Sequence, residues 1–297
     1  MTGRDGTTTA QPPAASTVGV RLDREGPIAT VTLCRPEVLN AQTPDMWAAL
    51  REYARELTAE TRVVVVRGEG RSFSAGLDLS VAGAPAPGGG ASGGTATGDG
   101  GAARSASGAG DEPAPSGASL GELAKLPPER AEERIAVFQE AFSWLRRPDL
   151  ITIAAVQGHA IGAGFQLALA CDFRVATEDA AFTMAEVKLG LVPDLTGTKR
   201  LVELVGYARA LEICVTGRRV PAAEAERIGL ANLVVPRADL DGAVADLTAA
   251  VLAAPRDAVV EIKALIAGAA GRDFAAQEAA ERAAQVRRLR DLAGVGE

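Results

Sequence analysis

The residues best placed to do chemistry in this chain follow an apolar strand near the middle of the sequence. Residues 153–173 read I-A-A-V-Q-G-H-A-I-G-A-G-F-Q-L-A-L-A-C-D-F, an apolar run that reaches Gly162, Ala163 and Gly164 just before an apolar helix. Glycine permits backbone conformations that other residues avoid, and the first turn of a helix leaves N–H groups unpaired at the positive end of the helix dipole. We therefore expect this junction to bind an anion, or a carbonyl oxygen that becomes negative during a reaction.

A second loop of this kind follows an earlier strand. Val63 to Val66 is an uninterrupted run of β-branched residues, which is typical of a strand buried on both faces, and residues 68–79 then read G-E-G-R-S-F-S-A-G-L-D-L. Two strand, loop and helix units of this type favour an α/β fold with ligand-binding groups at the strand ends.

Hydrophobic periodicity predicts the elements around these two units. We expect a hairpin over residues 18–33, helices over 40–60 and 129–147, and short strands at 173–176 and 181–183. Beyond residue 197 the pattern predicts helices only, at 199–205, 207–216, 221–229, 240–253, 258–267 and 274–292.

Two segments have a composition that disfavours folding. Residues 1–17 are predicted to be a disordered tail, and 34 of the 40 residues at 81–120 are Gly, Ala, Ser, Pro or Thr, which predicts a disordered insertion. The predicted organisation is therefore a tail, an α/β core over 18–220 that contains the insertion, and a helical region over 221–297 that mediates oligomerisation.

Composition and single residues exclude several functions. A net charge of −7 argues against a nucleic-acid partner, and no apolar run reaches the roughly 18 residues of a membrane span. The start of the chain lacks the apolar segment of a secretory signal, so we expect a cytoplasmic protein. Cys34, Cys171 and Cys214 have no metal-binding spacing and are interpreted as reduced core thiols. His159 is the only histidine and it lies inside a glycine-rich turn, so a serine hydrolase is not expected.

Four motifs together resemble the crotonase superfamily, the enoyl-CoA hydratase/isomerase family. They are R-P-E-V-L-N-A at residues 35–41, S-F-S-A-G-L-D-L at 72–79, V-Q-G-H-A-I-G-A-G-F-Q-L-A-L-A-C-D-F at 156–173, and F-T-M-A-E-V-K-L-G-L-V-P-D-L-T-G-T-K-R-L at 182–201. The motifs follow the family's order and approximate spacing. The resemblance implies an α/β fold in which β-β-α units form a crotonase-like spiral, followed by a helical C-terminal region.

The resemblance also implies where a substrate carbonyl binds. In this family two backbone N–H groups hold the thioester oxygen of an acyl-CoA, and the matching positions here are Leu77 and Ala163. Donors fixed where negative charge develops stabilise an enolate by about 3 to 4 kcal/mol each. Gly76, Gly162 and Gly164 are the residues that shape these two turns.

Proton transfer is implied at three further positions. Hydratases of the family use two glutamates, and the matching residues here are Gln166 and Glu186, of which only the glutamate can titrate. Asp194 occupies the position at which dienoyl-CoA isomerases of the superfamily carry a catalytic aspartate, eight residues after Glu186. The resemblance therefore implies double-bond isomerisation of an enoyl- or dienoyl-CoA, with enoyl-CoA hydration as the nearest alternative. From the residues alone, the alternatives are that Glu186 is a surface loop carboxylate and that Asp194 is a capping residue before the helix near Gly197.

The remaining implied contacts concern coenzyme A and the assembly. Residues that match the family's CoA-binding loops are Arg35, Val38, Ser74 and Ala75. Coenzyme A is part of the substrate, so no metal and no separate cofactor is implied. The family forms homotrimers or dimers of trimers, and the same assembly is expected here.

Two functions of other classes stay open at this point. A glycine-rich turn between a strand and a helix is also found in dinucleotide-binding oxidoreductases, although the loop reads G-x-x-x-G-x-G rather than G-x-G-x-x-G, and Glu178 and Asp179 are expected in a turn. A non-catalytic acyl-CoA-binding protein would explain the glutamine at position 166.

Overall fold

The computed structural model describes residues 18–82 and 120–295. The predicted tail over 1–17 and residues 83–119 of the predicted insertion lie outside the described residues. The outermost positions of that insertion are helical rather than disordered, because α2 (Leu79–Ala82) and α3 (Leu120–Leu123) include residues 81, 82 and 120.

Six strands form the main sheet, in the order β1-β2-β3-β4-β6-β9. The strands are β1 (Val20–Glu25), β2 (Ile28–Leu33), β3 (Val63–Gly68), β4 (Ile151–Val156), β6 (Phe173–Thr177) and β9 (Leu233–Val235). β1 and β2 form the predicted antiparallel hairpin, and every later pair in the sheet is parallel. The carboxyl ends of β3 and β4 therefore lie at the same edge of the sheet. β3 leads directly into the first glycine-rich loop, and β4 leads through the short strand β5 (His159–Ile161) to the second.

Both faces of the central strands are buried. In β3, Val64 and Val66 belong to the larger hydrophobic core, while Val63 and Val65 point to the opposite face and a smaller core. This alternation explains the uninterrupted valine run, because successive side chains of a strand point to opposite faces.

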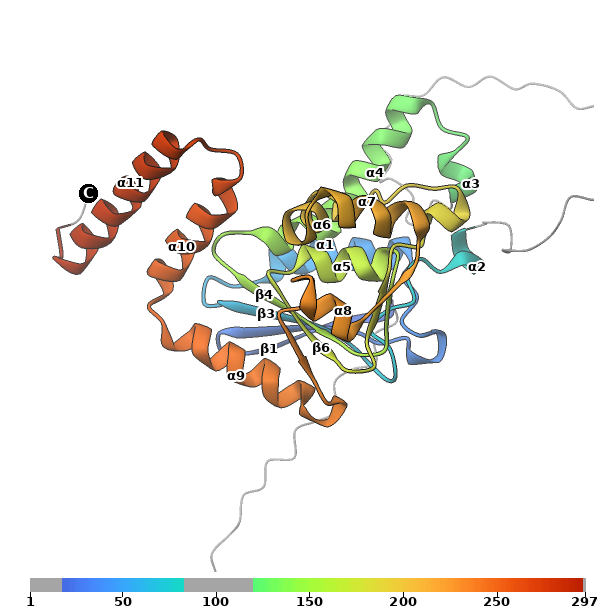
Figure 1. The fold of residues 1–297 in the computed structure, drawn as a ribbon, viewed down its shortest axis with the longest axis horizontal. Coiled ribbons are helices and arrows are strands. Elements are labelled where there is room, and N and C mark those ends of the chain that lie inside the picture. The colour runs from blue at the N-terminus through green and yellow to red at the C-terminus, as the bar shows by residue number, and fades with distance from the viewer. Residues whose placement is uncertain (1–17, 83–119, 296–297) are drawn as a thin grey trace, which may run out of the picture.

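Helices cover the two faces of the sheet. α1 (Pro44–Glu56), α4 (Pro128–Ser143) and α5 (Ala163–Ala170) contribute to the larger core, and α9 (Leu240–Ala253) contributes to the smaller one. Figure 1 shows α1 and α5 on one side of the strands and α9 on the other. The mixed α/β fold confirms the predicted class.

A smaller three-stranded sheet lies beside the second glycine-rich turn. Its order is β5-β7-β8, formed by β5 (His159–Ile161), β7 (Ala181–Thr183) and β8 (Arg219–Pro221). β5 ends directly before Gly162, and β7 is followed by the short 3₁₀ helix η3 (Glu186–Leu189). The small sheet thus brings the start of α5 and the start of η3 together.

The later part of the chain is mostly helical, with one correction to the prediction. α6 (Gly197–Val205), α7 (Tyr207–Thr216), α8 (Ala222–Arg227), α9, α10 (Arg256–Ala269) and α11 (Phe274–Leu292) match the predicted helices closely. β8 and β9 were not predicted. Three-residue strands such as Leu233–Val235 give too short an apolar run to distinguish from a loop, and only their pairing partners reveal them.

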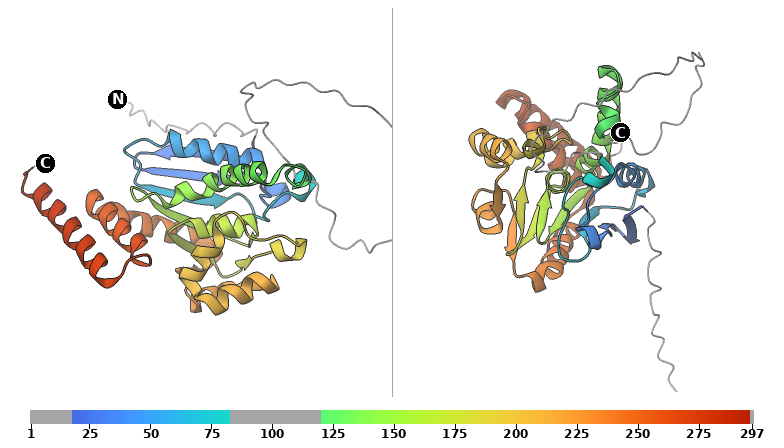
Figure 2. Two further views of the ribbon diagram at one scale, coloured as in Figure 1. Left: turned by 90° about the horizontal axis from the view of Figure 1, so that it is seen from above. Right: turned by 90° about the vertical axis from the view of Figure 1, so that its right-hand side faces the viewer.

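The last two helices contribute little to the core. α10 has no buried residue, α11 has only Ala284, and Figures 1 and 2 show the two helices to one side of the sheet. Large apolar side chains stay exposed along them: Ile262, Ile266, Phe274, Val286, Leu289 and Leu292. An apolar surface of this kind usually marks a contact with another molecule.

Two cations with little exposed surface connect the end of α5 to later segments. Arg174 has no exposed surface, and it donates hydrogen bonds to the carbonyls of Cys171 (2.8 Å) and Leu230 (2.6 Å). Lys263 of α10 donates to the Leu150 carbonyl (2.6 Å) and to the Asp172 carboxylate (2.7 Å). Both cations lie near the C-terminal end of α5, where the helix dipole favours positive charge.

Within residues 18–82 and 120–295, no helix is long and apolar enough to cross a bilayer.

Candidate active site

The two glycine-rich loops come into direct contact. Gly76 has a φ of +90°, and a Cβ atom added to it would lie 2.6 Å from the Ile161 carbonyl oxygen and 3.6 Å from the Ala163 nitrogen. Only glycine fits here, because both the positive φ and the close backbone exclude a side chain. The loop after β3 therefore lies against the first residues of α5.

Leu77 and Ala163 present backbone N–H groups at this contact. The backbone N–H of Gln42 donates to the Gly76 carbonyl (2.6 Å), and the backbone carbonyl of Gln42 accepts from the Asp78 N–H (2.8 Å). Leu77 lies between these two residues in a parallel pairing, so its own N–H points away from Gln42. Ala163 is the first residue of α5, where an N–H has no partner in the helix. Neither N–H has an acceptor within residues 18–82 and 120–295.

Glu186 lies beside the second of these donors. Its side chain is buried, with 9% of the residue exposed, so the alternative of a surface carboxylate is wrong. A Cβ added to Gly162 would lie 3.3 Å from Glu186 Oε1. The carboxyl group therefore packs against the residue that immediately precedes Ala163.

Gln166 connects this carboxyl group to the segment before α6. Its Nε2 donates to Glu186 Oε1 at 2.7 Å. Its Oε1 accepts from the backbone N–H groups of Leu195 (2.8 Å) and Gly197 (3.2 Å). Glu186 Oε2 is buried and has no hydrogen-bond partner in the described part of the chain.

Burial raises the pKa of two carboxyl groups in this region. The pKa of Glu186 is raised chiefly by burial, with a further contribution from the negative charge of Asp194, while the Gln166 hydrogen bond opposes the rise. Burial also raises the pKa of Asp194, which is half-buried. Asp194 does not cap α6, because the helix N-cap is Thr196.

The residues matched to CoA binding differ in what their side chains already contact. Arg35 pairs with Asp78 at 2.9 Å and donates to the Ala41 carbonyl, and Ser74 is fully buried with its hydroxyl donating to the Asn40 carbonyl. Val38 is 40% exposed and Ala75 is partly exposed, so these two are accessible from outside. CoA contacts at these positions stay a prediction.

Close packing explains the glycine that follows Ala163. A Cβ on Gly164 would lie 2.6 Å from Ser74 Cβ, so the two loops could not approach each other with any larger residue. This agrees with the predicted importance of the glycine.

Two polar residues that position the first loop were missed at the sequence level. Asn40 adopts a left-handed conformation (φ 56°) and its side-chain nitrogen donates to the Ser72 carbonyl at 2.8 Å. Gln42 donates to the Ser74 hydroxyl at 3.1 Å and accepts from the Trp47 indole at 2.8 Å. The only sequence signal was the position of Asn40 and Gln42 in or next to the R-P-E-V-L-N-A motif.

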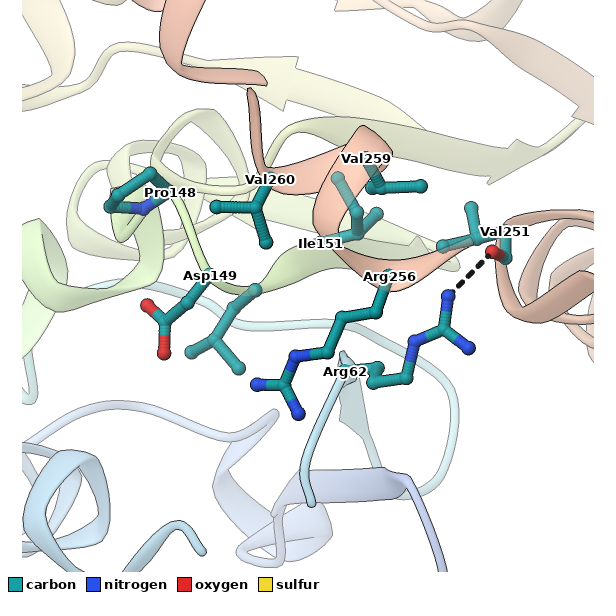
Figure 3. A pocket seen from close by; sticks show the side chains of 9 residues that line it. Arg62, Pro148, Asp149, Ile151, Val251, Arg256, Val259 and Val260 are labelled. Atoms are coloured by element: carbon teal, nitrogen blue, oxygen red, sulfur yellow. Dashed lines mark hydrogen bonds between the residues drawn. The ribbon is translucent and has the colours of Figure 1, made fainter. Parts of the chain in front are cut away.

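A hollow in the described surface is separate from this site. Figure 3 shows it beneath the start of α10, where Arg62, Pro148, Val251 and Arg256 contribute to its lining. Its volume is about 10 Å³, hardly room for one water molecule. No residue of the candidate active site lines it, so it belongs to the packing of α10.

A family model described as enoyl-CoA hydratase/isomerase matches residues 107–291. This chain belongs to that family. A Bacillus subtilis relative named enoyl-CoA hydratase/isomerase YngF is 38% identical over 229 residues, which are 76% of this chain and 72% of YngF. Enzyme function follows from the family. The dinucleotide-binding alternative does not hold, and Glu178 and Asp179 indeed lie in a turn.

Two solved structures of an enoyl-CoA hydratase from Thermobifida fusca YX share this fold at 42% identity. One is a complex with CoA, with a TM-score of 0.77 and coverage of 93% of this chain and 95% of that chain. The other is a complex with acetoacetyl-CoA, with a TM-score of 0.78 and coverage of 92% and 96%. The family relationship therefore extends over the described fold, including the loop of Leu77 that precedes the matched residues 107–291.

Proposed function

We propose that this enzyme binds an acyl-CoA thioester and isomerises the double bond of an enoyl- or dienoyl-CoA. Binding of the thioester is supported by the two N–H groups at Leu77 and Ala163, and by the CoA and acetoacetyl-CoA complexes of the Thermobifida relative. The observation that carries the reaction type is the pairing of Glu186 with Gln166, which leaves one titratable group beside the donors.

The proposed reaction begins with the removal of one proton. Glu186 takes a proton from a carbon next to the double bond or the carbonyl, so that a C–H bond breaks and its electron pair moves into an enolate. The N–H groups of Leu77 and Ala163 hold the enolate oxygen, a contribution of about 3 to 4 kcal/mol per donor. The proton returns to a different carbon, a new C–H bond forms, and the double bond has moved.

Atoms and electrons balance within the substrate, so the proposal includes no metal and no redox cofactor. The raised pKa of Glu186 suits this work, because a base is most effective when its pKa approaches the working pH. Asp194 is the second carboxyl group in reach of the same region, and its raised pKa qualifies it to return the proton in a dienoyl substrate.

Hydration is the second candidate, and Gln166 argues against it. Adding water to an enoyl-CoA needs a group that removes a proton from the water, and an amide cannot do so. Both polar atoms of Gln166 are also occupied, one by Glu186 and the other by the Leu195 and Gly197 N–H groups. Isomerisation requires only the Glu186 carboxyl group and the N–H groups of Leu77 and Ala163.

The test follows the fate of the proton. We would incubate 2-enoyl-, 3-enoyl- and dienoyl-CoA with the enzyme in deuterated water and record label position and water addition. Isomerisation predicts deuterium at the carbons that exchange, without a hydroxyacyl product. Glu186→Gln should abolish exchange, whereas the exposed Glu178→Gln should not change it. Hydroxyacyl-CoA as the main product would favour the hydratase, and tight binding without turnover of any thioester would favour a non-catalytic protein.

The assembly is proposed to be a homotrimer, alone or paired into a hexamer. The family relationship supports it, and so do the exposed apolar residues of α10 and α11, among them Ile266 (70% exposed) and Leu289 (55% exposed). Sedimentation velocity tests it: Ile266→Glu with Leu289→Glu should lower the mass of the particle, and Gln277→Glu on the same helix pair should not. An unchanged mass in the double variant would contradict the role of these helices.

A further inference from the structure

The orientation of the Gln166 amide is fixed by what surrounds it. Backbone N–H groups can only donate, so the atom that faces Leu195 and Gly197 must be the amide oxygen. The amide nitrogen must then face Glu186, at 2.7 Å from Oε1. An amide nitrogen can only donate, so Oε1 of Glu186 is held as an acceptor in both protonation states.

The two oxygens of Glu186 are therefore not equivalent. Any proton that the carboxyl group carries resides on Oε2, because Oε1 already receives the Gln166 N–H. Oε2 is also the atom that is buried without a hydrogen-bond partner within the described residues, and such atoms in native proteins are often functional. Both oxygens lie near Gly162, since a Cβ added there would be 3.3 Å from Oε1 and 3.9 Å from Oε2.

We propose that Gln166 is a positioning residue that assigns the two oxygens of Glu186 different roles, with Oε1 anchored and Oε2 exchanging the proton with the substrate. The inference rests on the proposed function, since it names the reacting atom of the same base. The C–H bond of the substrate breaks, Oε2 takes the proton, and the same atom releases it to another carbon.

The segment before α6 is shaped around the Gln166 side chain. A Cβ on Gly197 would lie 2.7 Å from Gln166 Cγ and 3.1 Å from its Oε1, so only glycine allows the N–H of residue 197 to reach the amide oxygen. Thr196 takes a left-handed conformation (φ 72°) between the two donating residues, which is unusual for a β-branched side chain. The left-handed Thr196 and the tightly packed Gly197 both serve to direct N–H groups at the Gln166 amide oxygen. We infer from this that the orientation of the Gln166 amide matters.

The titratable neighbours of Glu186 come from two packed elements. Asp194, in the segment before α6, raises the pKa of Glu186 through its charge, and Cys214 of α7 has its own pKa raised partly by Glu186. Among described residues, Gln166 of α5 is the side chain that hydrogen-bonds to the carboxyl group. Its replacement therefore changes the titration of Glu186 without removing any other partner.

The decisive variant is Gln166→Glu, which preserves length and shape. The Leu195 and Gly197 N–H groups stabilise the charged form of the new glutamate, so the proton that the pair retains resides on Glu186 and inactivates the base. Ionising Glu186 next to an existing anion then requires a higher pH. We expect the pH at half-maximal kcat on the acidic limb to rise by at least about one unit, which lowers kcat at the wild-type midpoint by about fivefold or more relative to wild type.

Gln277→Glu is the matched control. Gln277 Nε2 also donates to a glutamate, Glu281 Oε1 at 3.0 Å, but on the exposed surface of α11. The same chemical change there should leave the midpoint in place. A second variant, Gln166→Met, removes the donor without adding charge, and it should raise the midpoint by less than Gln166→Glu.

A readout independent of activity is the titration of the Glu186 carboxyl carbon by NMR, with its signal assigned by loss in Glu186→Gln. It should show the same upward shift even if turnover is too slow to measure. An unchanged midpoint in folded Gln166→Glu, by kinetics and by NMR, would overturn the proposal. Full activity of Glu186→Gln would instead refute the proposed function, so the two failures are distinguishable.

Discussion

The contact between the two glycine-rich loops leads to a prediction with a defined magnitude, for Gly76→Ala. An added Cβ would lie 2.6 Å from the Ile161 carbonyl oxygen, whereas an ordinary contact begins at 3.4 Å, so the loops must separate by about 0.8 Å. A displacement near 1 Å in a positioned group costs about 100-fold in rate, similar to the loss of one oxyanion donor. We therefore expect kcat to fall by about 100-fold or more.

The backbone strain of the substitution needs its own control. Gly206 has a φ of +80° and no atom within 4 Å of an added Cβ, so Gly206→Ala places a side chain at a positive φ without a clash. Both variants should lose about 1–3 kcal/mol of unfolding free energy from the unfavourable φ. Only Gly76→Ala should also lose kcat. Leu77→Ala retains the backbone N–H, so its kcat should stay within a few fold of wild type.

The assay is steady-state isomerisation with the thioester on which the wild type is most active, at a temperature where both glycine variants are folded by circular dichroism. If folded Gly76→Ala retains a kcat within about fivefold of Gly206→Ala, the two loops do not form the oxyanion site. That result would also remove the basis for assigning the N–H groups of Leu77 and Ala163.

Two further predictions concern stability. Arg174→Lys should lower the unfolding free energy in urea by more than about 3 kcal/mol, because an ammonium cannot reach the carbonyls that the buried guanidinium serves and each charged hydrogen bond is worth about 1.5–3 kcal/mol. Arg130→Lys, at an exposed position, should change the unfolding free energy by less than about 0.5 kcal/mol. Equal losses in the two variants would contradict the role given to the buried guanidinium of Arg174. Glu186→Gln should be more stable than wild type at neutral pH. Folding raises the pKa of Glu186, so the wild type loses unfolding free energy as pH rises from about 4.3, the pKa in the unfolded chain, to the folded pKa. The loss is about 1.4 kcal/mol for each unit by which the pKa is raised. Below about pH 4.3 the wild type and Glu186→Gln should therefore be equally stable. A pH-independent difference would refute this reason.

Local sequence pattern predicts the parts of this fold that depend on neighbouring residues. The hairpin of β1 and β2, the doubly buried β3 and the helices beyond residue 197 each have a periodicity that requires no knowledge of distant segments. β9 escapes prediction because three residues carry no period, and its strand character comes from pairing with β6.

The candidate site divides in the same way. The glycines at 76 and 162 are recognisable in the sequence, because positive φ restricts the residue type. The hydrogen bonds of Gln166 are not, since its partners Glu186, Leu195 and Gly197 follow at least 20 positions later and meet it only after α5, η3 and α6 have packed. Resemblance located these positions, and geometry supplied what their side chains contact.

The ion pair between Lys263 and Asp172 has a practical consequence for any shortened version of the chain. The Asp172 carboxylate also accepts hydrogen bonds from the backbone and hydroxyl of Thr152 in β4, so it joins the sheet to the end of the helix that carries Gln166. Deleting α10 and α11 to improve solubility would leave that carboxylate without its cation. Charged substitutions at the exposed apolar residues of α10 and α11 are the safer route. They retain the Lys263–Asp172 ion pair and remove the exposed apolar surface.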